Sequence, residues 1–547
     1  MTPSAMHRAV LRDYARAVVH LRSQFAEKRF GLILGAGVVT DFNVPMWPEL
    51  VRKVAADPDV KGTQLLKGEA SKKSLPYQAE MLFQHYRKKA RTKIALGTSE
   101  LFVQSVINAG WSKICGKYIY ASAPKRLDVA LKKHGYFSSL LPLVRGSHLT
   151  ITFNFDDFLE RALSTHKDKA DSGRGYEVVT NPWPQFRRRN SVIYHPHGVV
   201  PFESNLMELP ADRFVFAEAA YSAQYVGSRG HDTSYLLGHF ARNTCLIIGC
   251  SLEDELRNVL MRGAEINPGN YHYYIHYVES DKRGPSAAQK ALIAETNFNV
   301  YNLITLFLTR EKIKALLELL DVQQFGDSSF KDAAENAGVN WRYNFYLTGC
   351  IGVGKSTTAS QLRSLHAMDE WLEVRPAILA KSWESLTAKE RKAADEWIVN
   401  QFGDKNSALR DRGPGIAIID RPPLDPLAFT PEKGRPAKAK SLLDRMCPNR
   451  KRGTSRVEDG TVILLTGDAD VLTARVRATG REDYSRERLE RMQETMRHIY
   501  NRDGVHVIDT RNLSVQEVTK QVADIIHRAS YKPCDVHGAL EAYENAI

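Results

Sequence analysis

The sequence has no C-x-x-C pair, and its six cysteines are scattered along the chain. Neither a disulfide framework nor a zinc site built from paired cysteines is therefore expected. It also has no apolar run of about 20 residues, the length that a membrane helix needs. The N-terminus lacks the apolar block of a secretory signal. These absences predict a cytoplasmic protein with no zinc and no membrane partner.

A compositional bias towards disorder is missing as well. Apolar residues make up 43% and charged residues 25% of the chain, ordinary values for a folded globular protein. A length of 547 residues exceeds what one core normally organises, so two or three domains are expected. The net charge of +13 is compatible with binding to nucleic acid, with binding to anionic nucleotides, or with a role in solubility alone. Nucleic acid therefore stays an open alternative and is not the favoured partner.

Short apolar runs, separated by segments long enough for helices, define a first series of strands. Apolar residues at helical spacing over Val10–Phe25 indicate an amphipathic helix ahead of it. The expected strands are Phe30–Leu34, Leu149–Phe153, Val192–Tyr194, Cys245–Gly249 and Tyr273–Val278. This alternation is typical of a parallel, doubly wound α/β sheet. The scarcity of strand signals over residues 51–145 predicts a helical insertion.

A polar segment of small residues around Gln323–Asn344 marks the expected domain boundary. A second series of strands follows, at Phe345–Thr348, Ile416–Ile419, Val462–Leu465 and Val505–Ile508. The pattern is again α/β, and no internal repeat indicates a solenoid. We therefore predict two doubly wound parallel-sheet domains, a Rossmann-like one over residues 1–325 and a second one over residues 340–547.

Four short motifs follow strands of the first series. Gly35-Ala36-Gly37 comes directly after the first strand, where glycines let backbone amides approach a pyrophosphate. Later strands lead into Asn154-Phe155-Asp156, His195-Pro196-His197-Gly198 and Gly249-Cys250-Ser251. Because strand carboxyl ends meet at the ligand crevice of an open α/β sheet, the motifs are expected to converge. The alternatives are a simple turn at the glycines and helix caps at Asn154 and Asp156.

In this order the motifs resemble those of the sirtuin family, especially its bacterial NAD-consuming branch, over about residues 25–320. The resemblance implies that Asn154 holds the nicotinamide ribose and an attacking water, and that His197 is the general base. It also implies NAD+ as the substrate, bound by Gly35, Ala36, Gly37, Asp156, Gly249 and Ser251. Histidine suits this role because it accepts a proton near neutral pH. His195 is the less favoured base and is expected to support the loop.

Two features separate the chain from the sirtuin deacylases that it resembles. The paired cysteines of their zinc module are absent. The stretch from Val38 to Trp47 has valine and methionine where a deacylase typically has serine and aspartate. Hydrolysis of NAD+ to nicotinamide and ADP-ribose is therefore the expected reaction, with deacylation or ADP-ribosyl transfer as alternatives.

The second series of strands opens with a Walker A motif, Gly349-Cys350-Ile351-Gly352-Val353-Gly354-Lys355-Ser356. A strand precedes it, and a helix is expected over Thr357–Leu365. In such loops backbone amides bind phosphates, the lysine (here Lys355) reaches the β and γ oxygens, and the serine (Ser356) ligates Mg²⁺. The expected ligand is ATP or another nucleoside triphosphate with Mg²⁺. The expected phosphate-binding residues are Gly349, Gly352, Gly354, Lys355, Ser356 and Thr357.

Asp420-Arg421 follows the strand Ile416–Ile419 and is similar to the Asp-Arg pair of nucleoside and nucleoside-monophosphate kinases. This resemblance covers about residues 340–530. It implies that Asp420 acts on Mg²⁺ or the acceptor hydroxyl and that Arg421 grips the acceptor. Arg475 and Arg481 precede an amphipathic helix, as in the arginine-bearing lid of those kinases. An exposed helical face is the alternative interpretation of these arginines.

Three hypotheses for the function remain. The first is an NAD+ hydrolase that acts as an antiviral defence effector, controlled by the kinase-like domain through a nucleotide or phage-derived trigger. The second is a nucleoside or nucleoside-monophosphate kinase with a regulatory sirtuin-like domain. The third is a nucleic-acid-associated protein that uses the basic run over Pro431–Arg456. Resemblance to sirtuin-like NADases further implies a homo-oligomer.

Overall fold

The computed structural model describes residues 3–133, 135–165, 175–180, 191–203, 231–252, 254–280, 283–381, 385–449, 455–478 and 484–546. Contacts divide the chain into two units. The first unit comprises Met1–Val10, Gln24–Ile266 and His272–Gly326, and the second comprises Leu11–Ser23, Asn267–Tyr271 and Asp327–Ile547. The domain limits of 1–325 and 340–547 stay predictions.

Seven strands, all paired in parallel, form the sheet of the first unit in the order β3-β4-β2-β1-β5-β6-β7. They are β1 (Phe30–Leu34), β2 (Leu149–Thr152), β3 (Tyr176–Val179), β4 (Ser191–Tyr194), β5 (Thr244–Ile248), β6 (His272–Tyr277) and β7 (Leu303–Leu308). β1 lies between β2 and β5, with Leu32 opposite Thr150 on one side and Leu246 on the other. Central strands covered on both faces are apolar throughout, and all five residues of β1 are buried.

Helices cover this sheet and form the expected insertion. They are α1 (Ala5–Ala26, whose middle groups with the second unit), α2 (Trp47–Ala55), α3 (Leu75–Thr92), α4 (Glu100–Ile119), α5 (Leu127–Lys133), α6 (Gly135–Gly146), α7 (Phe158–Thr165), α9 (His231–Arg242), α10 (Asp254–Ile266), α11 (Ala287–Tyr301) and α12 (Arg310–Leu320). From α2 to α6 the described residues contain helices and no strand. α2, α3 and α4 pack around Leu82 and Trp111, and Val200 from the loop after β4 joins this cluster. The insertion therefore contacts a loop at the carboxyl edge of the sheet.

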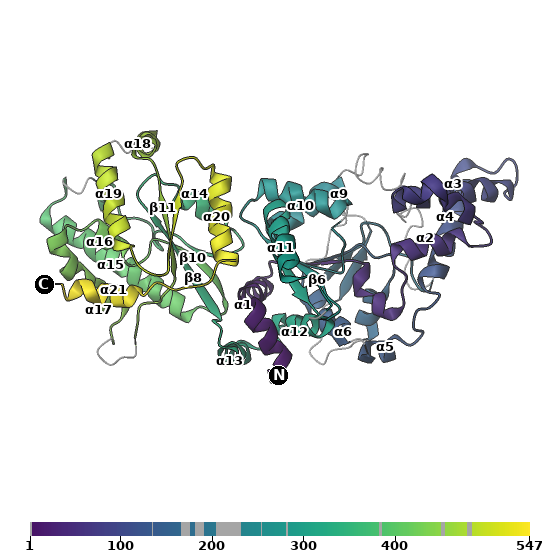
Figure 1. The fold of residues 1–547 in the computed structure, drawn as a ribbon, viewed down its shortest axis with the longest axis horizontal. Coiled ribbons are helices and arrows are strands. Elements are labelled where there is room, and N and C mark those ends of the chain that lie inside the picture. Colours follow the sequence, from purple (N-terminus) through teal and green to yellow (C-terminus); the bar gives the residue numbers. More distant parts are fainter. Residues whose placement is uncertain are drawn as a thin grey trace. The chain divides into compact units, whose positions relative to one another are not determined.

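Five parallel strands form the sheet of the second unit in the order β12-β11-β8-β10-β9. They are β8 (Arg342–Gly349), β9 (His366–Met368), β10 (Gly415–Asp420), β11 (Thr461–Thr466) and β12 (Val505–Asp509). The helices are α13 (Asp327–Ala337), α14 (Lys355–Gln361), α15 (Ala388–Asp411), α16 (Asp425–Ala428), α17 (Arg435–Met446), α18 (Ala469–Ala478), α19 (Arg486–Ile499), α20 (Val515–His527) and α21 (Val536–Glu544). In Figure 1, α14 and α20 lie on one side of the strands, and α15, α16 and α19 lie on the other. The predicted α/β class with two parallel sheets is confirmed.

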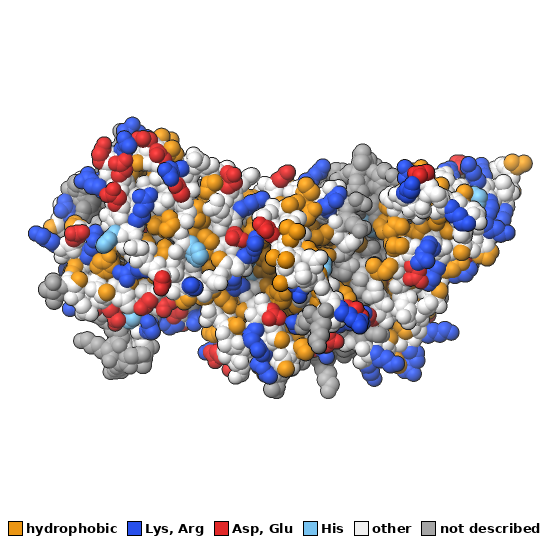
Figure 2. Space-filling model, viewed as in Figure 1, with side chains coloured by type: hydrophobic (Ala, Val, Ile, Leu, Met, Phe, Trp, Pro, Cys, Tyr) orange, Lys and Arg blue, Asp and Glu red, His pale blue; other side chains and the backbone are white. Residues whose placement is uncertain are grey.

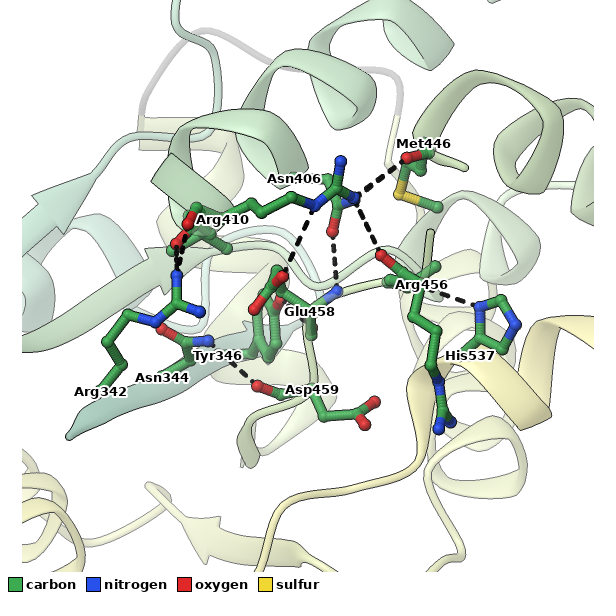
Figure 3. A network of polar contacts seen from close by, with 12 residues as sticks. Arg342, Asn344, Tyr346, Asn406, Arg410, Met446, Arg456, Glu458, Asp459 and His537 are labelled. Carbon is green, nitrogen blue, oxygen red and sulfur yellow. Dashed lines mark hydrogen bonds and ion pairs between the residues drawn. The ribbon is translucent and has the colours of Figure 1, made fainter. Parts of the chain in front are cut away.

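A polar network holds the irregular segment that precedes β11 (Figure 3). Asn406 on α15 donates to the carbonyls of Met446 (3.2 Å) and Arg456 (3.3 Å), and it accepts from the amide of Glu458 (2.8 Å). The Tyr346 hydroxyl on β8 donates to the Glu458 carbonyl at 2.7 Å. Buried backbone groups outside regular structure need such partners. We assign the network a structural role, because the Walker A loop follows the opposite end of β8.

Charges of both signs are mixed on the face that Figure 2 displays, where acidic side chains lie among the basic ones. This mixture is the pattern of an ordinary solvated surface. Across the described ranges, no helix combines the length and the apolar character that crossing a membrane requires.

The structure departs from the sequence-based expectation at a few elements. β3, β7 and β9 are additional strands. The apolar run of β7 leads almost directly into the amphipathic helix α12, which is rich in leucine, so the strand and helix patterns merge in the sequence. The helix expected over Thr357–Leu365 ends at Gln361, because Leu362 leaves the helical region (φ −89°, ψ 50°). This turn buries both Leu362 and Leu365.

Candidate functional site

The loops after β1 and β5 approach each other backbone to backbone. The amide of Gly35 donates to the carbonyl of Ile248, and the amide of Gly37 donates to that of Gly249, each at 2.9 Å. A Cβ on Gly35 would lie 2.5 Å from the Gly249 oxygen, and one on Gly37 would lie 2.7 Å from Gly249 Cα. Gly249 has φ +70°, in the left-handed region that favours glycine. The three glycines are therefore required by this close contact.

The loops after β2 and β4 are joined on both sides of His197. On one side, Nδ1 of His195 lies 3.1 Å from the carbonyl oxygen of Asn154. On the other side, the amide of Val200 donates to the carbonyl of Phe155 at 2.7 Å. The two connections hold the His197 segment against the Asn154 segment, although 43 positions separate the two residues in the sequence.

The ring of His197 packs against two phenylalanines that flank Asn154. Its centroid lies 5.2 Å from that of Phe153 and 6.0 Å from that of Phe155. Asn154 and His197 are each 6% exposed. Oδ1 of Asn154 is buried and has no hydrogen-bond partner within the described ranges. An unpaired buried oxygen costs free energy, so this atom is suited to accept a hydrogen bond from a ligand.

His195 is fully buried, and both of its ring nitrogens are engaged. Nε2 lies 2.7 Å from Oε1 of Glu160 on α7, while Nδ1 faces the Asn154 carbonyl. Burial lowers the pKa of His195, but the charge and hydrogen bond of Glu160 outweigh this effect, and the pKa lies above its ordinary value. A ring with two engaged nitrogens cannot take a proton from a substrate. A supporting role of His195 in the loop therefore stays our prediction.

Two buried aspartates follow Asn154 and start α7. Oδ1 of Asp156 accepts from the amide of Phe158 at 3.1 Å, which is a helix-cap contact. Burial raises the pKa of Asp156 to about 7, so its protonation changes near neutral pH. Asp157 accepts from the hydroxyl of Tyr120 and from the amide of Phe202, both at 2.9 Å. The second aspartate thus adds a further connection between this turn and the loop after β4.

The Walker A loop joins β8 to α14 through glycines in the left-handed region. Gly352 has φ +83° and Gly354 has φ +104°. Nζ of Lys355 is held by the loop itself, since it donates to the carbonyls of Gly349 (2.9 Å) and Cys350 (3.2 Å). Burial, followed by the charge of a nearby arginine, lowers the pKa of Lys355. The ammonium group of Lys355 therefore lies beside the loop, where it could donate to the oxygens of a bound phosphate.

Asp420, at the end of β10, faces the start of α14. Its Oδ2 accepts from Oγ of Ser356 at 3.3 Å, and its Oδ1 is buried without a hydrogen-bond partner in the described part of the chain. Burial raises the pKa of Asp420. Nζ of Lys405 donates to the Asp420 carbonyl at 2.8 Å, and burial lowers the pKa of that lysine to about 8. A carboxylate and a hydroxyl are the hard oxygen donors that fit Mg²⁺.

Arg421, the residue after Asp420, is held between two carboxylates. Its Nε donates to Glu370 at 2.7 Å, and its Nη1 donates to Asp425 at 3.2 Å. Asp425 also accepts from the hydroxyls of Thr348 (2.6 Å) and Tyr500 (2.5 Å). A backbone φ of +67° at Arg421 is unusual for a residue with a side chain. The guanidinium is therefore fixed by the protein in this arrangement.

Family models match both regions. The model of a SIR2-like domain matches residues 148–301, and the model of an AAA domain matches residues 344–517. The chain joins a SIR2-like domain to an AAA-type P-loop domain. No curated protein matches the chain.

Solved structures with similarity to the chain include three proteins. The tunicamycin resistance protein of Deinococcus radiodurans is 19% identical, with a TM-score of 0.24, over 35% of this chain and 99% of its own. Thymidylate kinase from Candida albicans is 17% identical, with a TM-score of 0.26, over 35% of this chain and 97% of its own. NadR in complex with NR is 13% identical, with a TM-score of 0.25, over 56% of this chain and 87% of its own. At these scores the similarities support no statement about activity.

The SIR2-like domain brings most of the expected site residues to one edge of its sheet. Gly35, Gly37 and Gly249 form the contact between the loops after β1 and β5, and Ala36 lies between the first two glycines. Asn154, Asp156 and His197 lie in the joined loops after β2 and β4. The Phe153 amide donates to the Leu34 carbonyl at 2.9 Å and links the two groups. Ser251 is exposed after β5. Glu160 has no motif that signals its pairing with His195.

In the P-loop domain, Gly349 ends β8, Gly352 and Gly354 lie in the loop, and Lys355 and Ser356 begin α14, on which Thr357 is exposed. Arg475 is exposed on α18, and its Cβ would lie 3.9 Å from a Cβ on Gly352. Arg481 lies outside the described residues. No sequence motif signals Glu370 or Lys405, since Glu370 follows a three-residue strand and Lys405 is one of many lysines on polar helices. Among the described residues, no three His, Cys, Asp or Glu side chains form a metal-binding group.

Gly249→Ala should destabilise the SIR2-like domain. The added Cβ would lie 2.6 Å from the Val38 amide nitrogen on a backbone with positive φ, and we expect a loss of about 2–4 kcal/mol. Gly263→Ala is the matched control, because Gly263 lies in α10 with no atom within 4 Å of its Cβ position. It should be neutral or more stable by up to about 1 kcal/mol. Urea unfolding measures both, and equal midpoints for the two variants would contradict the close-contact account.

Asp156→Asn should change how stability depends on pH. The pKa of Asp156 is raised from 3.8 to about 7, so the folded state holds this proton more tightly than the unfolded chain. The stabilisation is present below pH 4 and is lost as the pH rises to about 7, a loss of up to about 4 kcal/mol. In thermal unfolding, the stability of the variant relative to the wild type should therefore increase from pH 4 to pH 8. A constant difference across this range would show that Asp156 is ionised in the folded state throughout.

Proposed function

We propose that the SIR2-like domain hydrolyses NAD+ to nicotinamide and ADP-ribose. One observation supports this proposal above the others: the buried Oδ1 of Asn154 has no hydrogen-bond partner in the described ranges, in a segment on which the ring of His197 packs. An amide oxygen can orient a ribose hydroxyl or a water without adding charge. The Gly35, Gly37 and Gly249 contact lies at the same edge, where a dinucleotide would extend.

The proposed reaction breaks the bond between the nicotinamide nitrogen and C1′ of the ribose. The electron pair of this bond leaves with nicotinamide, and positive charge develops on the ribose. Water then adds to C1′ and loses a proton, which His197 accepts as general base. Asn154 orients the water and the ribose in this scheme. The buried position of both side chains supports it, because few other nucleophiles can reach C1′.

Control by the P-loop domain belongs to the same proposal. An enzyme that consumes NAD+ must be restrained, and a domain that binds nucleotides offers two states whose balance a ligand can shift. The role we propose is that of an antiviral defence effector, with a nucleotide or phage-derived trigger and assembly into a homo-oligomer. The fusion of the two domains in one chain supports it.

His197→Ala should lower the rate of nicotinamide release by about 10²–10⁴-fold, because a positioned general base contributes that much. The matched control is His85→Ala on α3 of the insertion, which should keep the wild-type rate. Nicotinamide and ADP-ribose are quantified after incubation of the purified full-length chain with NAD+, with and without ATP. Equal rates for His197→Ala and the wild type would remove His197 from the reaction.

A second candidate function is phosphorylation of a nucleoside or nucleoside monophosphate by the P-loop domain. The unpartnered Oδ1 of Asp420 beside the Ser356 hydroxyl supports it. These two residues would hold Mg²⁺, which would neutralise charge on the phosphates when bound. Lys355 would contact the terminal phosphates. Arg421 already donates to Glu370 and Asp425. It could bind the acceptor only after these contacts rearrange; otherwise other residues bind the acceptor.

Lys355→Ala should weaken binding of ATP with Mg²⁺ by at least about tenfold, because it removes the charge that faces the phosphates. Lys440→Ala, an exposed lysine on α17, is the matched control. Calorimetric titration measures the affinity, and labelled phosphate transfer to a panel of nucleosides and monophosphates separates catalysis from sensing. Unchanged ATP affinity in Lys355→Ala would contradict the assignment of the loop.

A further inference from the structure

Glu160, His195 and Asn154 form a chain of buried contacts that ends at the candidate nucleotide site. Oε1 of Glu160 lies 2.7 Å from Nε2 of His195, and Nδ1 of His195 lies 3.1 Å from the Asn154 carbonyl. Glu160 is 4% exposed and His195 is 0% exposed. A carbonyl oxygen can only accept, so Nδ1 carries a proton, and an ionised carboxylate requires a second proton on Nε2. The ring is thus held between the two oxygens, with Nδ1 facing the carbonyl of Asn154 and Nε2 facing the carboxyl group of Glu160.

Stability alone gives little reason for this arrangement. Removing two charges from water costs about as much as their attraction returns, and apolar residues often replace buried ion pairs without loss. The arrangement does fix the orientation of the groups in the chain of contacts. The Glu160 carboxylate fixes the ring plane, and the ring fixes the backbone of Asn154, whose side-chain Oδ1 has no partner in the described ranges. Tyr176 on β3 anchors the other end by donating to the Glu160 carbonyl at 3.1 Å.

We propose that Glu160 and His195 are positioning residues that act through Asn154, and that they hold its amide oxygen in place for the ribose and the attacking water. This inference rests on the proposed NAD+ hydrolysis for its consequence on the reaction. The contact chain itself is independent of that function. Neither residue exchanges a proton with the substrate, since both nitrogens of His195 are occupied inside the protein.

Two substitutions of Glu160 separate position from charge. In Glu160→Gln, the side-chain amide can donate to Nε2 of a neutral ring, while Nδ1 keeps its proton and donates to the Asn154 carbonyl, so positioning survives. In Glu160→Ala, the ring loses its support. The matched control is Asp57→Asn, which alters another buried carboxylate of the first unit, one that accepts from Lys117 and Tyr118.

The first measurement does not depend on NAD+ turnover. Hydrogen–deuterium exchange of the full-length chain should show faster exchange in the peptide covering residues 149–158 for Glu160→Ala, and wild-type exchange there for Glu160→Gln and Asp57→Asn. Unchanged exchange in Glu160→Ala would overturn the inference. Faster exchange combined with a wild-type chain that never cleaves NAD+ would uphold the contact chain and reject the proposed function.

The second measurement tests the route through Asn154. Glu160→Ala should lower hydrolysis by about 10–100-fold, the cost of a small misplacement of a catalytic group, and Glu160→Gln should remain within about threefold of the wild type. Labelled nicotinamide also measures the ratio of base exchange to hydrolysis. This ratio does not depend on the fraction of folded protein. Among the variants, only Glu160→Ala should raise the ratio. In an Asn154→Ala background, Glu160→Ala should cause no further loss. A further loss as large as in the wild type would show that Glu160 acts independently of Asn154 and would overturn the proposal.

Discussion

Parallel pairing of every strand places the carboxyl ends of β4, β2, β1 and β5 side by side. In an antiparallel sheet, alternate loops would leave from opposite edges, and the same motifs would be separated. Here the shared direction puts a glycine contact next to the joined loops that carry Asn154 and His197. The same constraint acts in the P-loop domain, where β8 and β10 end together and bring Ser356 opposite Asp420.

Much of this arrangement can be predicted from the sequence, because apolar runs bounded by polar motifs identify the central strands. The run at Phe30–Leu34 has the bounds of β1, and Gly35 follows it directly. The Walker A motif likewise fixes the place of Lys355. Edge strands are harder to predict, since they need less burial: two of the three residues of β9 are exposed. Sequence spacing does not indicate the Glu160–His195 pair, because its two residues are 35 positions apart.

The two candidate sites use buried charge differently. Around Asn154, one ion pair supports a neutral amide, and Asp156 lies where burial favours its protonated form. Around Asp420, cations and carboxylates alternate, and both Lys355 and Lys405 have pKa values lowered first of all by burial. The first arrangement suits an uncharged orienting group beside a developing cation. The second arrangement suits a polyanion such as a nucleotide phosphate. Its oxygens could take the place of the backbone carbonyls that Lys355 and Lys405 contact in this structure.

A structure of the full-length chain bound to a non-cleavable NAD+ analogue tests the central claim most directly, namely that the loops after β1, β2, β4 and β5 form one dinucleotide site. The account predicts the nicotinamide ribose within hydrogen-bond distance of Oδ1 of Asn154, about 3 Å, with the ring of His197 facing C1′ and the pyrophosphate beside the Gly37 and Gly249 contact. An analogue bound elsewhere, with Asn154 and His197 both remote from its ribose, would contradict it.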